Sequence, residues 1–182
     1  MSGATTRGHG MRGAIARRLF LAASAVLALG LLPGRALAAG PQIVGWVEVV
    51  QLHADRPITL KAKMDSGAKT SSLAVTDLQR FSRRGQSWVR FRIQAGSGAG
   101  VVMERPVLRT VRIKRHGRAN KARPVVVMGL CVGSVFKRTQ IDLADRGNYL
   151  YPLLVGRRFL QGDFLIDPGR TLTVTPHCAA AP

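Results

Sequence analysis

The chain has 182 residues, with 28 Lys or Arg against 9 Asp or Glu and a formal net charge of +19. Aromatic residues make up only 5%, and the cations are scattered along apparent strands and turns. This argues against a nucleic-acid-binding protein, which gathers cations on one face and stacks bases on aromatic rings. The charge suits acidic partners or surfaces, and a basic surface that only confers solubility explains it equally well.

Residues 1–38 have the pattern of a signal peptide. Four arginines and no acid precede the apolar run Leu19–Leu32, and Ala36-Leu37-Ala38 fits a cleavage site. The apolar run is shorter than the roughly 20 residues of a membrane span, so we expect cleavage and no stable membrane anchor afterwards. The Arg17-Arg18 pair fits a twin-arginine signal, and an ordinary secretory signal fits as well.

The predicted mature chain, residues 39–182, is long enough for about one domain in the periplasm or outside the cell. Loss of the five arginines of the signal lowers the net charge from +19 to +14. No nucleic acid is expected as a partner.

Short strands separated by turn residues dominate this segment. Trp88–Ile93 alternates apolar and basic residues, which is the period of a strand with one solvated face. One short helix or turn is expected at Arg157–Gln161, and the tail Pro176–Pro182 is expected to be frayed. The pattern predicts an all-β domain, a small barrel or a sandwich. The other expected strands are Ile43–Leu52, Ile58–Met64, Val101–Met103, Val107–Lys114, Val125–Met128, Leu130–Val132, Lys137–Leu143, Tyr151–Val155 and Leu172–Val174.

Two cysteines, Cys131 and Cys178, leave two possibilities open. An oxidising compartment allows a disulfide between them. A buried Cys131 beside a free Cys178 is an equally good account, because the sequence gives no distance between their α-carbons. The histidines are isolated from one another and no C-x-x-C or H-E-x-x-H motif is present, so no metal site is predicted.

The triplet Asp65-Ser66-Gly67 follows one of the predicted strands. Asp-Ser-Gly is a common turn, in which Asp and Ser bond back to the backbone and Gly accepts a positive φ. Here, however, Ala68 follows directly, and an apolar run that ends in Gly156 and Arg157 comes far downstream. That combination makes a catalytic role a second interpretation of the triplet, in addition to a simple turn.

Together these motifs resemble the retropepsin-like aspartic peptidases. More closely, the chain resembles a bacterial family often labelled ATP-dependent zinc proteases, whose members are associated with RimK-type glutamate ligases. The resemblance implies a retropepsin-like acid-protease barrel over residues 39–182 with one short helix at the Gly-Arg segment. The matching pieces, in order, are Val44–Trp46, Lys61–Leu73, Trp88–Phe91, Glu104–Pro106, Arg123-Pro124, Tyr151–Leu160 and Phe164–Pro168.

The resemblance implies that Asp65 is catalytic. Aspartic peptidases hold a water between two carboxylates that share one proton, so that one acts as base and the other as acid. The chain has a single Asp-Ser-Gly triplet, and the second carboxylate would be Asp65 of another copy. A twofold homodimer is therefore expected, with the active site on its axis.

The remaining site residues also follow from the resemblance. Ser66 would hydrogen-bond across the dimer and Gly67 would offer its amide to the carboxylate. Ala68 would form the floor of the peptide cleft. Gly156 would give room beneath the loop, and Arg157 would open the helix.

Viral retropepsins carry an acid soon after the loop, where this chain has Lys69. Arg157 is therefore expected to find another carboxylate, Asp163 or Asp167, or a solvated role. The glycine-rich stretch around Gly98 sits at a plausible place for a hairpin that closes over the substrate, and a surface hairpin without substrate contact is the alternative.

Three functions remain open from the sequence. The first is an exported aspartic endopeptidase, to which acidic, glutamate-rich peptides would be suited as substrates. The second is a binding module on the same fold for acidic envelope polymers or a protein partner. The third is a metal-dependent hydrolase. No phosphate-binding loop and no histidine spacing supports the ATP or zinc of the family label, and no cofactor is predicted.

Overall fold

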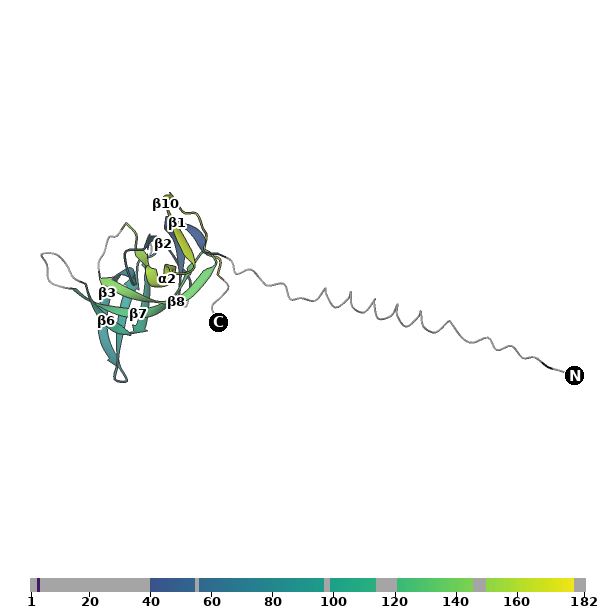
Figure 1. Cartoon of the computed structure of the whole chain (residues 1–182). Coiled ribbons are helices and arrows are strands. Elements are labelled where there is room, and N and C mark those ends of the chain that lie inside the picture. The colour runs from purple at the N-terminus through teal and green to yellow at the C-terminus, as the bar shows by residue number, and fades with distance from the viewer. Residues whose placement is uncertain are drawn as a thin grey trace. The chain divides into compact units, whose positions relative to one another are not determined.

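The computed structural model describes residues 3, 40–54, 56–96, 99–113, 121–145 and 150–178. The chain divides into two compact units, Met1–Ala39 and Gly40–Pro182, and the described strands and helix lie in the second unit (Figure 1). Along the chain they are β1 (Gln42–His53), β2 (Ile58–Asp65), β3 (Ser71–Arg83), β4 (Gln86–Ile93), β5 (Val101–Pro106), β6 (Arg109–Ile113), β7 (Lys121–Val132), β8 (Val135–Asp145), β9 (Leu153–Gly156), α2 (Arg157–Leu160) and β10 (Phe164–Thr171).

Six of these strands close a barrel within the described residues. The order β1-β2-β9-β3-β8-β7 returns to β1, because β1 pairs with β2 along one edge and with β7 along the other. Two parallel pairs, β2 with β9 and β3 with β8, lie inside this ring. The predicted all-β barrel with one short helix is therefore confirmed.

The barrel is filled by side chains that alternate along its strands. In β2, Ile58, Leu60, Ala62 and Met64 are buried, while the residues between them face outward. This is the period of two that a strand with one apolar face shows. Phe159 of α2 is fully buried and stacks on a phenylalanine at the start of β10, with ring centroids 5.7 Å apart, which anchors the short helix to the core.

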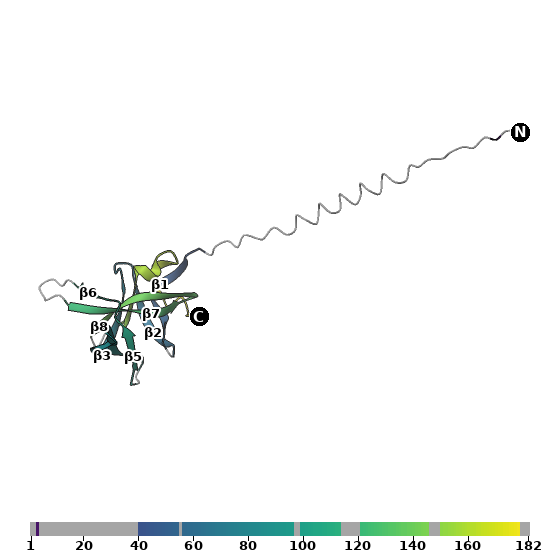
Figure 2. The same cartoon turned by 90° about the horizontal axis from the view of Figure 1, so that it is seen from below.

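A second, three-stranded sheet extends from the barrel. β3 continues past its pairing with β8, pairs with β4, and β4 pairs with β5. Figure 2 shows β3 and β5 together, below the barrel strands β7 and β8. The alternation predicted for Trp88–Ile93 is confirmed, since Val89, Phe91 and Ile93 are fully buried and Arg90 is exposed.

Two strands were missed from the sequence. β3 is rich in Ser, Thr, Asp and Gln, and β10 contains Asp167-Pro168-Gly169, which is typical of a turn. Among the described strands β10 pairs only with β1, and an edge strand tolerates Pro because its free edge needs no N–H donor.

The strand predicted at Leu172–Val174 is wrong. Leu172 has a φ of 53°, and the amides of Thr173 and Val174 donate to the carboxylate of Glu48 rather than to a neighbouring strand. Glu48 is fully buried in β1 and also accepts from the amide of Gly45. A carboxylate therefore takes the place of a strand partner for this segment.

The two cysteines form a disulfide. Cys131 in β7 is bonded to Cys178, with their α-carbons 6.0 Å apart, and the amide of His177 donates to the carbonyl oxygen of Gly133. The predicted fraying is therefore wrong for Pro176–Cys178, which is tied to the barrel, and residues 179–182 lie outside the described part.

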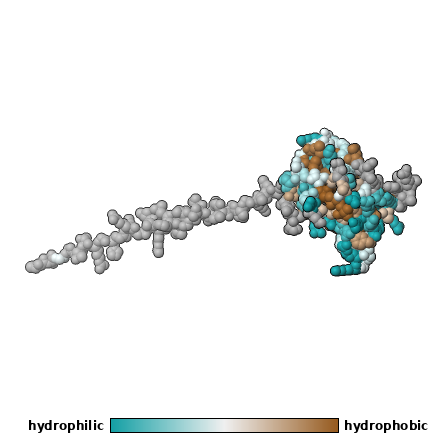
Figure 3. All heavy atoms as spheres, turned by 180° about the vertical axis from the view of Figure 1, so that it is seen from behind, coloured by the Kyte–Doolittle hydropathy of each residue, from teal (hydrophilic) through white to brown (hydrophobic). Residues whose placement is uncertain are grey.

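The surface is mostly polar with separate apolar patches, as the face in Figure 3 shows. Two of the exposed large apolar residues, Ile43 and Leu165, are partners in the β1–β10 ladder, with 59% and 56% of their surface exposed. No helix in the described part of the chain has the length and apolar character needed to cross a membrane.

Candidate active site

Asp65 is the last residue of β2, where the strand leaves the barrel. Its Cα is paired with that of Gly156 in the parallel ladder between β2 and β9. Met64, one residue earlier, points into the core and is buried, whereas Asp65 is half-buried and Ser66 and Gly67 are exposed. The end of a core strand thus carries a carboxylate to the surface on a rigid element.

The turn after Asp65 binds one oxygen of its carboxylate. Oδ1 accepts hydrogen bonds from the amides of Gly67 at 2.9 Å and Ala68 at 3.1 Å. Oδ2 accepts none from the described residues. The amide of Gly67 therefore contacts the carboxylate as expected, and the second oxygen is left for another partner.

Gly156 lies directly beneath this turn. A Cβ at this position would come within 2.7 Å of the carbonyl carbon of Thr70 and 2.9 Å of the amide nitrogen of Ser71, both backbone atoms. The amide of Gly156 also donates to Oγ of Ser71. Only a glycine allows β9 to approach the loop so closely.

Arg157 continues the contact between the two segments. Its amide donates to the carbonyl oxygen of Ala68 at 2.8 Å, and its Nη1 donates to the carbonyl oxygens of Ser66 at 2.8 Å and Gly67 at 3.1 Å. The start of α2 is thus bound to three consecutive carbonyls of the Asp65 turn.

Of the two alternatives for Arg157, pairing with Asp163 or Asp167 is wrong, and its side chain is exposed, as the solvated alternative expected. Asp163 forms an ion pair with Lys137, and Asp167 accepts a hydrogen bond from the amide of Gly169. Lys69 offers no carboxylate to this arginine, and backbone carbonyls take the place of an acid as its acceptors. This arrangement is invisible in the sequence, because any residue supplies a carbonyl.

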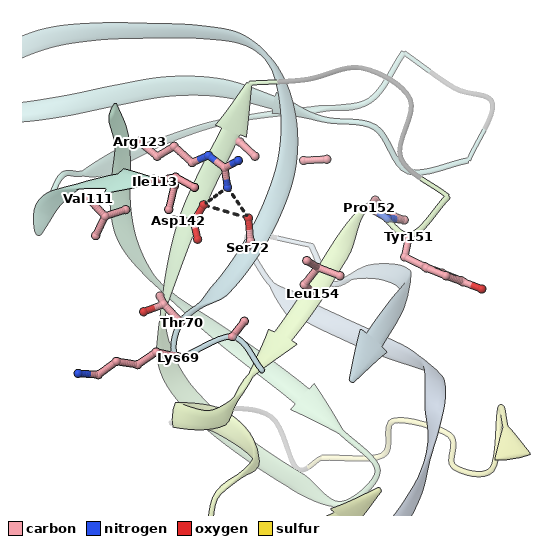
Figure 4. A pocket seen from close by; sticks show the side chains of 13 residues that line it. Lys69, Thr70, Ser72, Val111, Ile113, Arg123, Asp142, Tyr151, Pro152 and Leu154 are labelled. Carbon is pink, nitrogen blue, oxygen red and sulfur yellow. Dashed lines mark hydrogen bonds and ion pairs between the residues drawn. The ribbon is translucent and has the colours of Figure 1, made fainter. Parts of the chain in front are cut away.

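A pocket of about 460 Å³ opens beside the turn and is lined by residues of the turn and of β3, β6, β7, β8 and β9. Ala68, which bonds to Asp65, lines the pocket, as do Lys69 and Leu154. On the other side, Val111 and Ile113 of β6 line it (Figure 4). A cavity of this size adjoining a carboxylate has the dimensions of a side-chain or small-ligand site.

A polar network lies in this pocket, and the sequence did not predict it. Arg123 and Asp142 form an ion pair, with Nη1 and Oδ1 2.8 Å apart and only 7% of each side chain exposed. Ser72 donates to the same Oδ1 at 2.9 Å and accepts from Nη1 at 3.3 Å. Figure 4 shows the three side chains pointing toward one another. Arg123-Pro124 was among the pieces that matched the family, but nothing in the sequence assigned this arginine to the site or paired it with Asp142.

Gly98 lies outside the described residues. The stretch around it connects β4 to β5, which pair as an antiparallel hairpin, but none of its described residues lines the pocket. The strand that does border the pocket from the far side is β6, which pairs with β7.

In the described part of the chain, no group of three His, Cys, Asp or Glu side chains is placed to hold a metal ion. The polar groups around the turn are one half-buried carboxylate, a buried ion pair, a hydroxyl and exposed cations. This set can orient a water and bind an anion or an acceptor group.

Several known proteins are similar to this chain in sequence or in structure. Over 115 residues the chain is 27% identical to a probable alpha-L-glutamate ligase of Shewanella pealeana, which covers 62% of this chain and 25% of the relative. Over 112 residues it is 30% identical to a probable alpha-L-glutamate ligase of Desulfotalea psychrophila, covering 60% of this chain and 24% of the relative. The chain thus spans about a quarter of the length of these relatives.

A crystal structure of Lpg0085, a protein with unknown function from Legionella pneumophila, superposes with a TM-score of 0.62 at 30% identity. The match covers 73% of this chain and 98% of the Legionella chain. The family model described as "Retropepsin-like aspartic endopeptidase RimB" matches residues 43–177, which include the Asp65 turn and all of the barrel strands except the first residue of β1. This chain therefore belongs to the RimB-like family of retropepsin-like aspartic endopeptidases.

Proposed function

We propose that this protein is an exported aspartic endopeptidase that hydrolyses peptide bonds as a homodimer. The observation that carries the proposal is the geometry of Asp65, a carboxylate held at one oxygen by two backbone amides and unbonded at the other within the described chain. A pocket large enough for a substrate side chain lies beside the turn that binds this carboxylate, with Ala68 in its wall. Family membership makes peptide hydrolysis the reaction to test first.

In the proposed dimer, Asp65 of each copy faces its counterpart and the pair shares one proton. The ionised carboxylate takes a proton from water as the water oxygen attacks the peptide carbonyl carbon, and the protonated one donates to the carbonyl oxygen. As the intermediate collapses and the C–N bond breaks, the carboxyl that took the proton from water gives it to the departing amine, and the other carboxylate takes a proton from a hydroxyl of the intermediate. The dyad is restored for the next cycle.

Acidic peptides are the proposed substrates. The predicted mature chain has a net charge of +14 after the five arginines of residues 1–38 are removed from +19. Lys69, Arg123 and Asp142 line the pocket beside the turn, and since Arg123 and Asp142 are paired, Lys69 gives these lining residues a net positive charge. A cationic cleft raises the local concentration of an anionic peptide and its rate of association.

The test is hydrolysis of an acidic peptide by the purified full chain and by Asp65→Asn, followed by mass spectrometry. The proposal expects cleavage by the wild type and none by the variant at an unchanged melting temperature. Sedimentation equilibrium should show a dimer at the concentrations that support turnover. Turnover that persists in Asp65→Asn contradicts the proposal.

A binding module is the second candidate, because the Shewanella and Desulfotalea relatives bear ligase names rather than peptidase names and one chain holds a single Asp-Ser-Gly triplet. This candidate expects a strictly monomeric protein that binds an acidic polymer, such as poly-glutamate, without cutting it. Calorimetric binding with no cleavage products would favour it over the peptidase.

A further inference from the structure

We infer that Arg123 is a specificity-determining residue, which binds a carboxylate of the substrate in the pocket beside the Asp65 turn. This inference rests on the proposed peptidase function and assigns one side chain to the choice of substrate. The residues that support it are the buried ion-pair network and the pocket walls around it.

The pocket is placed to receive a substrate side chain next to the reacting bond. Ala68 lines the pocket and its amide donates to Oδ1 of Asp65 at 3.1 Å. The pocket therefore begins one hydrogen bond away from the proposed catalytic carboxylate. A group bound within it belongs to a substrate residue at or near the scissile bond.

Arg123 reaches this pocket with two donor nitrogens that bond to no described residue, Nε and Nη2. Its Nη1 is used by Asp142 and Ser72, and its Nε is buried without a partner. Nη2 bonds to no described residue and, unlike Nε, is not fully enclosed by protein atoms. Arg123 as a whole is only 6% exposed and it lines the pocket, so we infer that a ligand reaches Nη2 from the pocket.

The network also fixes the direction of this donor. Asp142 of β8 and Ser72 of β3 hold Nη1 from two neighbouring strands, and Figure 4 shows the guanidinium at one end of the pocket. A planar guanidinium held at one nitrogen presents its remaining N–H groups in a set plane. The donor is thus oriented before a substrate binds, which lowers the entropic cost of binding.

The charge and the walls of the pocket select the ligand. Asp142 balances Arg123, and Lys69 adds one uncompensated positive charge among the lining residues. The walls are mostly apolar, formed by residues such as Val111 and Leu154. A short apolar stem that ends in a carboxylate matches both features, because the stem removes apolar surface from water and the anion meets a charge-assisted donor.

The ion pair also has a structural role, since it joins β3, β7 and β8. A purely structural pair would change stability when altered but would leave the choice between substrates unchanged. Substrate preference is therefore the readout that separates the two roles.

The experiment uses the full chain and a set of internally quenched peptides with amidated C-termini. A single glutamate is moved through the two positions on either side of the cleaved bond, and matched peptides carry glutamine or leucine there. At one position we expect kcat/KM for glutamate to exceed that for glutamine by about tenfold, the difference between a charged and a neutral acceptor.

Two variants then test Arg123 with opposite expected signs. Arg123→Lys keeps the charge beside Asp142 but lacks the second guanidinium donor, and we expect the preference to fall to about threefold or less. Asp142→Asn removes the competing negative charge, and we expect the preference to rise. Arg112→Lys is the matched control, because Arg112 is an exposed arginine of β6 that does not line the pocket, and it should keep the wild-type ratio.

A peptide offers two carboxylates to the pocket, the side chain of glutamate and the free C-terminus. Peptides with a free C-terminus, compared with amidated ones, show which of the two is bound. Preference for glutamate in amidated peptides identifies the side chain as the bound group. Dependence on a free terminus alone identifies the terminal carboxylate instead. Thermal melting confirms that each variant is folded.

The failures of the two proposals can be told apart. If Asp65→Asn is inactive but Arg123→Lys retains the full glutamate preference, Arg123 is not the specificity residue and the peptidase proposal stands. If the wild type cleaves none of the peptides, both proposals are overturned.

Discussion

The guanidinium of Arg157 donates a hydrogen bond to the carbonyl oxygen of Ser66 at 2.8 Å, between residues 91 positions apart in the chain. Ser66 follows Asp65, and Arg157 is the first residue of α2. The position of the carboxylate therefore depends on a helix that is encoded far from it. Because the same guanidinium also binds the carbonyl oxygen of Gly67, it holds the turn at two points.

Replacement of Arg157 by alanine is expected to lower kcat by about 10- to 100-fold with little loss of stability. The side chain is exposed, so its removal leaves no cavity, but the turn loses two fixed acceptors and Asp65 loses its exact placement, on which catalysis depends steeply. Steady-state hydrolysis and thermal melting measure the two effects. Arg158→Ala is the control, because the side chain of Arg158 is also exposed but bonds to Gln140, and its bond to Lys69 is made by the backbone amide, which alanine keeps. Equal losses in both variants would contradict this role.

Replacement of Gly156 by alanine is expected to destabilise the fold by about 1–3 kcal/mol, as overpacking of a tight contact does. The added methyl group would press on the backbone of Thr70 and Ser71, which has no flexible end to move aside. Urea unfolding followed by circular dichroism gives the change in the free energy of unfolding. Gly40→Ala is the matched control, since a Cβ there meets nothing within 4 Å. A neutral effect at position 156 would show that the loop and β9 are not in close contact.

The sequence predicted the fold well where the apolar period was regular. β2 and β4 alternate buried and exposed residues, and both were found at nearly the observed bounds. β3 was missed because its residues 76–83 are largely polar and mostly exposed. Its position is decided by pairing with β8, β9 and β4, which are tertiary contacts that local propensity does not contain.

The sequence predicted the residues of the site that belong to recognisable motifs, but not the contacts between side chains on different strands. Asp65 and Gly156 are visible as a motif, and the structure places their α-carbons side by side. The pair of Arg123 and Asp142 lies on two strands that meet only through the β7–β8 ladder, in which Asp142 is opposite Val125. A single sequence does not show which arginine faces which carboxylate, because that depends on strand register.

Replacement of Glu48 by alanine is expected to cost at least about 3 kcal/mol. The carboxylate is fully buried and accepts from three amides, those of Gly45, Thr173 and Val174, and from the hydroxyl of Thr173. Its loss leaves buried donors without acceptors, each of which carries a desolvation cost. Glu104→Ala is the control, because its ion pair with Arg83 is largely solvent-exposed and such pairs contribute about 0–1 kcal/mol. Chemical denaturation compares the two, and equal small losses would argue against a structural role for Glu48.

Removal of the disulfide between Cys131 and Cys178 is expected to lower the free energy of unfolding by about 2–4 kcal/mol. The bond joins residues 47 positions apart, and a cross-link over a loop of this length restricts the unfolded chain by about that amount. The measurement is urea unfolding of the wild type and of the doubly substituted Cys131→Ser, Cys178→Ser chain, each with and without a reductant. Reductant should shift the midpoint of the wild type towards that of the variant and leave the variant unchanged. A wild type whose midpoint does not move, although its two thiols react with a thiol reagent after reduction, would show that the cross-link adds nothing to the stability of the barrel.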